Sequence, residues 1–85
     1  MARKVAVIGI VIKGDRSVSK EVNQILSDYG DNILGRMGIP SRCSGISVIS
    51  IVLEGTPEEI SAITGKLGRL NNVNVKSAVT SVEID

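Results

Sequence analysis

The stretch VAVIGIVI, residues 5–12, decides the fold together with its counterpart ISVISIVL at residues 46–53. Apolar residues occupy both alternating sets of positions in each stretch, which is the pattern of a strand covered on both faces. The chain has 85 residues, and a length of this order forms one small domain, which we assign to residues 1–85. Because so short a chain cannot cover both faces of two strands by itself, the stretches predict an oligomer.

Two helices are expected between the strands. The first follows the turn at Gly14, with Ser17 as N-cap and Gly30 as the stop, because apolar residues recur at helical spacing at Val18, Val22, Ile25, Leu26 and Tyr29. The second begins at residues 56–59, Thr-Pro-Glu-Glu, where threonine, proline and a glutamate three residues after the cap form a capping box. It ends at Gly68 or at residues 71–72, after burying Ile60, Ile63, Leu67 and Leu70. Gly65, inside this helix, suggests the close approach of a neighbouring backbone.

Two further strands are expected at the sheet edges. Residues 32–39 contain two glycines and an arginine, which suits an edge strand that ends at Pro40, and residues 73–81 alternate as a half-buried strand does. The resulting order is βαββαβ. Right-handed crossovers then give an α+β, ferredoxin-like fold, a four-stranded antiparallel sheet with the first and third strands central and two helices on one face. The other face is left bare.

The composition excludes several classes of function. The net charge is +1, with acidic and basic residues interleaved, so neither nucleic acid nor a membrane is indicated as a partner. Tyr29 is the single aromatic residue, which leaves no stacking platform for RNA bases. The chain has no histidine and one cysteine, Cys43, so we expect no metal site, no internal disulfide and no cofactor. The short apolar run after the first residues fits a strand better than a signal peptide, and we expect a cytoplasmic protein.

Several segments resemble a known family: GRMGIP at residues 35–40, ISVIS at 46–50 and ITGKLG at 63–68, with VAVIGI at 5–10 and NVK at 74–76. The chain resembles the small regulators assigned to the iron-only hydrogenase system. The resemblance implies an ACT-like domain, similar also to the C-terminal regulatory domain of nickel-responsive repressors, that forms dimers or tetramers and has no catalytic residues. Nickel sites of that kind use histidines with a cysteine, so nickel binding is not carried over to a chain without histidine.

The resemblance also implies a place for a ligand. ACT domains bind a small molecule, often an amino acid, between the loop after the first strand and the second strand of a partner subunit. The positions that correspond in this chain are Gly14, Asp15, Arg16 and Ser17 in the loop, and Gly35, Arg36 and Met37 on the strand. Amide N–H groups at the helix start, with Arg16 or Arg36, would bind a carboxylate, and Asp15 would bind an ammonium group.

Plainer interpretations of the same residues stay open. Gly14 can simply make a turn, Arg16 can lie in water, and Gly35 can let strands of two subunits pack closely. Arg16, Arg36 and Arg42 could form an anion-binding patch. Cys43 fits an incidental loop thiol better than a redox sensor, since it has no resolving partner, and Met37 fits a packing role better than a metal ligand.

The function expected from these observations is a non-enzymatic regulatory or ligand-sensing module that acts as a homo-oligomer, with a protein partner. The alternative is a small acylphosphatase-like hydrolase on the same fold, in which a loop arginine such as Arg16 would hold phosphate. A phosphate cradle is not recognisable at residues 13–16, and the second strand lacks the asparagine that would position water.

Overall fold

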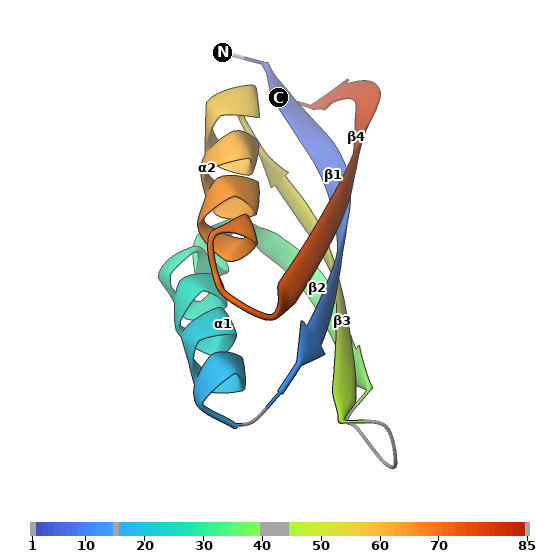
Figure 1. The fold of residues 1–85 in the computed structure, drawn as a ribbon. Coiled ribbons are helices and arrows are strands. Elements are labelled where there is room, and N and C mark those ends of the chain that lie inside the picture. The colour runs from blue at the N-terminus through green and yellow to red at the C-terminus, as the bar shows by residue number, and fades with distance from the viewer. Residues whose placement is uncertain (1, 15, 40–44, 85) are drawn as a thin grey trace.

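The computed structural model describes residues 2–14, 16–39 and 45–84. The elements follow one another as β1 (Arg3–Lys13), α1 (Arg16–Asp28), a 3₁₀ turn η1 (Gly30–Asn32), β2 (Ile33–Ile39), β3 (Ile46–Gly55), α2 (Pro57–Gly68) and β4 (Val73–Ile84) (Figure 1). The predicted βαββαβ order is therefore confirmed. The predicted sites at Asp15, Arg42 and Cys43 lie outside the described residues.

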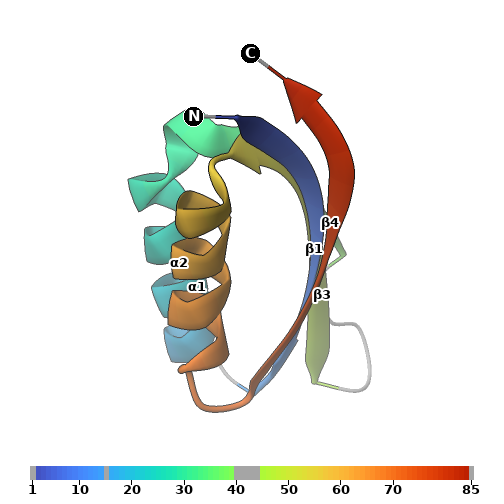
Figure 2. The same ribbon diagram turned by 90° about the horizontal axis from the view of Figure 1, so that it is seen from above.

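The sheet has four strands in the order β2-β3-β1-β4, and every neighbouring pair is antiparallel. The two doubly apolar stretches are thus the central strands, as predicted. Both helices cover one face of the curved sheet, and no helix of the described chain lies on the other face (Figure 2). The α+β, ACT-like arrangement expected from the sequence is confirmed.

The hydrophobic core lies between the helices and the sheet. Strand alternation directs every second residue of β1 and β3 toward the helices, and helical periodicity does the same for one stripe of α1 and of α2. The core residues are Ala6, Ile8, Ile10, Ile12, Val22, Leu26, Ile49, Ile51, Leu53, Ile60, Ile63 and Leu67. Leu70 is partly buried and packs against this cluster.

The two helices begin differently. Thr56 is the N-cap of α2, since its hydroxyl accepts a hydrogen bond from the Glu59 amide at 3.2 Å and the Glu59 carboxylate accepts one from the Thr56 amide at 2.8 Å. This confirms the predicted capping box. The prediction for α1 was wrong, because the helix already begins at Arg16 and Ser17 lies inside its first turn.

Two further boundaries and the surroundings of Gly65 differ from the expectation. The chain makes the 3₁₀ turn η1 before β2, so Asn32 is not part of the strand; its buried side-chain amide donates to the backbone carbonyl of Glu54 at 3.0 Å. Strand β4 runs on to Ile84, past a register shift against β1. The atom nearest to a Cβ at Gly65 would be the end of the Arg69 side chain at 4.0 Å, so no neighbouring backbone approaches Gly65 closely.

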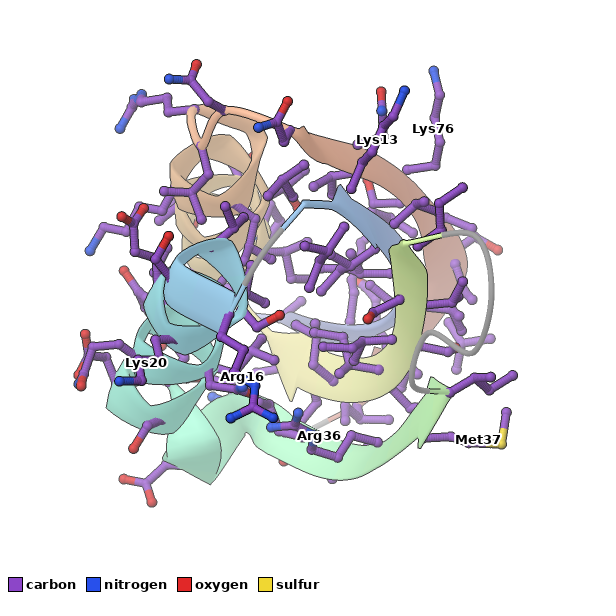
Figure 3. All side chains as sticks on the ribbon, turned by 60° about the horizontal axis from the view of Figure 1, so that its bottom comes forward. Lys13, Arg16, Lys20, Arg36, Met37 and Lys76 are labelled. Atoms are coloured by element: carbon purple, nitrogen blue, oxygen red, sulfur yellow. The ribbon has the colours of Figure 1, made fainter. Side chains whose placement is uncertain are left out.

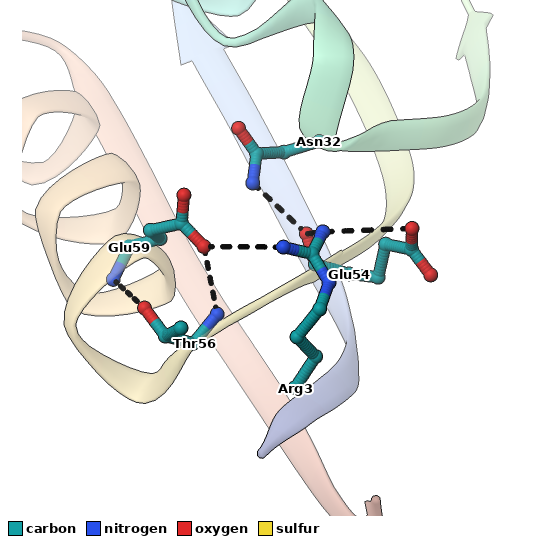
Figure 4. A network of polar contacts seen from close by, with 5 residues as sticks. All are labelled: Arg3, Asn32, Glu54, Thr56 and Glu59. Carbon is teal, nitrogen blue, oxygen red and sulfur yellow. Dashed lines mark hydrogen bonds and ion pairs between the residues drawn. The ribbon is translucent and has the colours of Figure 1, made fainter. Parts of the chain in front are cut away.

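A polar cluster joins the N-terminal ends of β1 and α2 (Figure 4). One guanidinium nitrogen of Arg3 lies 3.5 Å from a Glu54 carboxylate oxygen, and another lies 3.7 Å from the Glu59 carboxylate. The pKa of Glu59 is lowered, and the main cause is the hydrogen bond from the Thr56 backbone. Hydrogen bonds from the Asn32 and Thr56 side chains and the charge of Arg3 lower it further, whereas partial burial raises it. The cluster therefore favours the charged form of Glu59 in the folded protein.

Candidate functional site

The first candidate surface is the apolar side of the sheet that the helices leave uncovered. We call it the bare face and define it by Val7, Val11, Met37, Ile39, Ile46, Val48 and Val52. The four valines are 37–42% exposed, and Met37 and Ile39 on the edge strand are 64% and 56% exposed. An apolar patch that extends over neighbouring strands is typical of an interaction site.

The loop after β1 holds part of the predicted ligand site. Gly14 has a φ of 132°, which residues other than glycine rarely adopt, and its amide donates to the carbonyl of Gly45 at 3.3 Å. This N–H group is therefore already used within the chain. Arg16 and Ser17 open α1 and are exposed. The turn expected at Gly14 is present, and it ties the start of α1 to the start of β3.

The strand half of the predicted ligand site is divided between the two faces of the sheet. Arg36 pairs with the core residue Ile51 in the register of β2 and β3, and a terminal guanidinium nitrogen donates to the side-chain oxygen of Asn23 on α1 at 2.9 Å. Met37 pairs with Ser50 and belongs to the bare face. Figure 3 shows the Met37 side chain well away from that of Arg36. Within one chain, these two side chains therefore lie on opposite faces of the sheet.

A shallow hollow opens beside Arg36, between α1 and the ends of β2 and β3. Its volume is about 270 Å³, and it is lined by Ile12, Ser19, Asn23, Arg36, Gly38, Ile39, Ser47, Val48 and Ile49. The sequence interpretation included Arg36 but missed Ser19, Asn23 and Ser47. The first two could have been found, since they lie four residues apart on one side of the expected helix, next to its apolar stripe.

A metal site and a membrane-spanning helix are both missing from the described part of the chain. Residues 2–14, 16–39 and 45–84 contain no group of three or more histidine, cysteine, aspartate or glutamate side chains placed to hold a metal ion. Within the same ranges, neither helix is long and apolar enough to cross a bilayer.

Comparison with known proteins gives one family and several similar structures. A profile of the TM1266-like family, described as "Iron-only hydrogenase system regulator, putative", matches residues 4–77. The uncharacterized protein TM1266 from Thermotoga maritima is 30% identical over 91% of this chain and 96% of its own, with a TM-score of 0.87. A search of the curated proteins finds no match.

Two more distant structures share the fold. The ACT domain from the GTP pyrophosphokinase of Chlorobium tepidum is 16% identical, with a TM-score of 0.69 over 94% of this chain and 89% of that domain. An unknown protein from Galdieria sulphuraria is 10% identical, with a TM-score of 0.68 over 94% of this chain and 46% of its own. At these identities the likeness is one of fold.

Proposed function

The chain belongs to the TM1266-like family, and on that premise we propose that it is a non-enzymatic regulatory module that works as a homo-oligomer and responds to a small ligand. The family description supports a link to the iron-only hydrogenase system through a protein partner. The regulatory role is supported by the same description, which names a regulator. Its cytoplasmic location is part of the same proposal.

The bare face is the observation that carries the oligomer. Full burial of a valine or isoleucine side chain is worth about 1.5–3 kcal/mol, so each of the four valines of the face, about two-fifths exposed, would gain about 0.6–1.2 kcal/mol more if it were covered. The face continues across β1, β3 and β2, and two such sheets can pack about 10 Å apart. We take a second copy of the chain as the occupant, because the surface is apolar and the net charge of +1 gives two copies little repulsion.

Sedimentation equilibrium at micromolar concentrations tests this proposal. The wild-type chain is expected as a dimer or tetramer, and Val52→Glu is expected as a monomer, because it places a charge in the centre of the bare face. Ala62→Glu is the matched control: it adds the same charge on the exposed side of α2 and leaves the oligomer intact. A monomeric wild-type chain would contradict the proposed oligomer. If both variants were monomeric, the interface would not be located on the bare face.

A further inference from the structure

We propose that the hollow between α1 and the ends of β2 and β3 binds a small monocarboxylate that has an apolar tail and no ammonium group. The inference deepens the ligand-sensing part of the proposed function and rests on it for the role of the ligand. The pocket itself is built within one chain, from α1, β1, β2 and β3. In this respect it differs from the inter-subunit site that the sequence resemblance implies.

Arg36 supplies the anion-binding group. Its guanidinium has five N–H donors. One terminal nitrogen donates a hydrogen bond to the side-chain oxygen of Asn23 at 2.9 Å. This hydrogen bond fixes the side chain against α1. The ion pairs of the described residues are both made by Arg3, so no carboxylate of this part of the chain neutralises Arg36. A guanidinium that is fixed by one hydrogen bond and has no ion-pair partner among the described residues is a strong partner for a carboxylate. It can bind the carboxylate through two parallel hydrogen bonds.

Arg16 adds to the positive charge at this end of the molecule. It is the first residue of α1, and in the view of Figure 3 its side chain and that of Arg36 extend over the same region, from the helix and from β2. Lys20 and Met37 extend in other directions in this view. Arg36 is the arginine of the described lining, and Arg16 is not part of that lining. The charge of Arg16 at the start of α1 adds to the local positive charge, which raises the rate at which an anion meets this end of the molecule.

The remainder of the hollow suits an apolar tail. Ile12 and Ile49 are core residues that also line it. Ile39 and Val48, which are members of the bare face, belong to the same lining, so the hollow borders that face. The hydroxyls of Ser19 and Ser47 are the other polar side-chain groups besides Arg36 and Asn23. The volume of about 270 Å³ corresponds to about nine water molecules. A branched acid of about eight non-hydrogen atoms has the matching size and polarity.

The described lining contains no aspartate or glutamate. Among the described lining residues an ammonium group would find no opposite charge to offset the hydration that it loses on binding. For this reason we infer an anion and not a zwitterionic amino acid. The comparison of 4-methylpentanoate with leucine isolates this point, because leucine is the same acid with an ammonium group added.

The test is a titration of the full chain, followed by backbone amide NMR shifts, with 4-methylpentanoate, 4-methylpentanamide and leucine as probes. The carboxylate is expected to bind with a Kd of about 0.1–1 mM and to shift the amides of Ser19, Asn23 and Ser47. The neutral amide and leucine should each bind at least about tenfold more weakly. Absence of carboxylate binding would overturn the proposal, and tighter binding of leucine would overturn the ligand class.

Two variants with matched controls locate the site. Arg36→Gln should weaken carboxylate binding about tenfold or more, whereas Arg69→Gln, at the exposed C-cap of α2, should not.

A Cβ at Gly38 would meet nothing within 4 Å, so the Gly38→Val chain should fold, and its valine side chain should fill part of the hollow and block binding. Gly68→Val adds the same side chain at an open position on α2 and should leave binding unchanged. Unchanged binding by Arg36→Gln or by Gly38→Val would overturn the site.

The monomeric variant separates this inference from the proposed function. Val52→Glu should keep carboxylate binding even when it abolishes the oligomer, because the lining residues all belong to one chain. Loss of binding together with loss of the oligomer, in a variant whose NMR spectrum shows a folded chain, would overturn the intrachain pocket. If the wild-type chain is itself a monomer that binds the carboxylate, the oligomer fails and the pocket stands.

Discussion

The two faces of the central strands both carry β-branched aliphatic residues, but one face is buried and the other is exposed. Ile8 and Ile51 pair across β1 and β3 on the helix side and are fully buried, whereas their neighbours Val7 and Val52 pair on the bare face and are about two-fifths exposed. One pair is isoleucine and the other valine, and both residue types are aliphatic and β-branched, so an apolar strand pattern alone does not separate the pairs. The difference comes from the order of elements, since right-handed crossovers place both helices on one side. Coverage is thus a property of the topology, and an apolar strand face becomes a core or an interface according to what lies above it.

The largest effect expected from this comparison is on stability. Ile51→Ala should lower the free energy of unfolding by about 2–5 kcal/mol, because it leaves a cavity in a packed core. Val52→Ala, one residue away on the bare face, should cost less than about 1 kcal/mol in a chain kept monomeric by high dilution. Urea denaturation followed by circular dichroism measures both. Equal losses at low concentration would mean that the bare face is covered within the chain itself.

A pair of glycines extends the comparison to a smaller effect. A Cβ at Gly55, at the buried end of β3, would lie 3.0 Å from both the Asn32 amide nitrogen and a Glu59 carboxylate oxygen. Gly55→Ala should therefore destabilise the fold by about 1–3 kcal/mol through overpacking. Gly35, which pairs with Val52 toward the bare face, has nothing within 4 Å of its Cβ position.

The matched variant Gly35→Ala should consequently change the midpoint of urea denaturation by an amount equivalent to about 0.5 kcal/mol or less. Both variants can be compared in one series with the wild-type chain. A Gly55→Ala protein as stable as the wild type would show that the polar cluster can shift to make room.

The smallest expected effect is the pH dependence of stability that Glu59 contributes in the polar cluster. The pKa of Glu59 is lowered in the folded chain, so its contribution to stability is present above the pKa of an unfolded glutamate, about 4.3, and is lost as the pH falls through the lower folded value. Wild-type Tm should exceed that of Glu59→Gln near neutral pH, and the difference should shrink below about pH 4. Thermal denaturation at several pH values measures it, with Glu58→Gln as the control outside the cluster. A difference that does not vary with pH would contradict a role for the charge.

Much of the fold could be predicted from local patterns. The two apolar stretches, the capping box at Thr56 and the helical spacing of α1 each follow from short-range rules, and together they give the topology and the bare face. The structure differs where tertiary contacts decide. Asn32 leaves the strand for a 3₁₀ turn because its amide bonds a carbonyl of β3. Gly55 is needed for the close packing of two side chains that no spacing in the sequence brings together.

The candidate site was less predictable for the same reason. Alternation along a strand could have shown that Arg36 and Met37 point to opposite faces. The hydrogen bond from Arg36 to Asn23 joins residues that are far apart in the sequence, and only the packing of α1 over the end of the sheet brings them together. Ser47 enters the same hollow from β3. A pocket of this kind forms between elements and therefore leaves no motif within any one of them.

The central position of β1 has a consequence for how the chain folds. Arg3 pairs with Ile84, and the remaining residues of β1 pair with β3 and β4, so β1 finds its last partner only when nearly the whole described chain is available. Contacts of such sequence separation close large loops and slow folding. Until β4 has paired, one edge of the apolar strand β1 is open to any neighbouring chain. Aggregation therefore competes with correct assembly during synthesis and after dilution from denaturant.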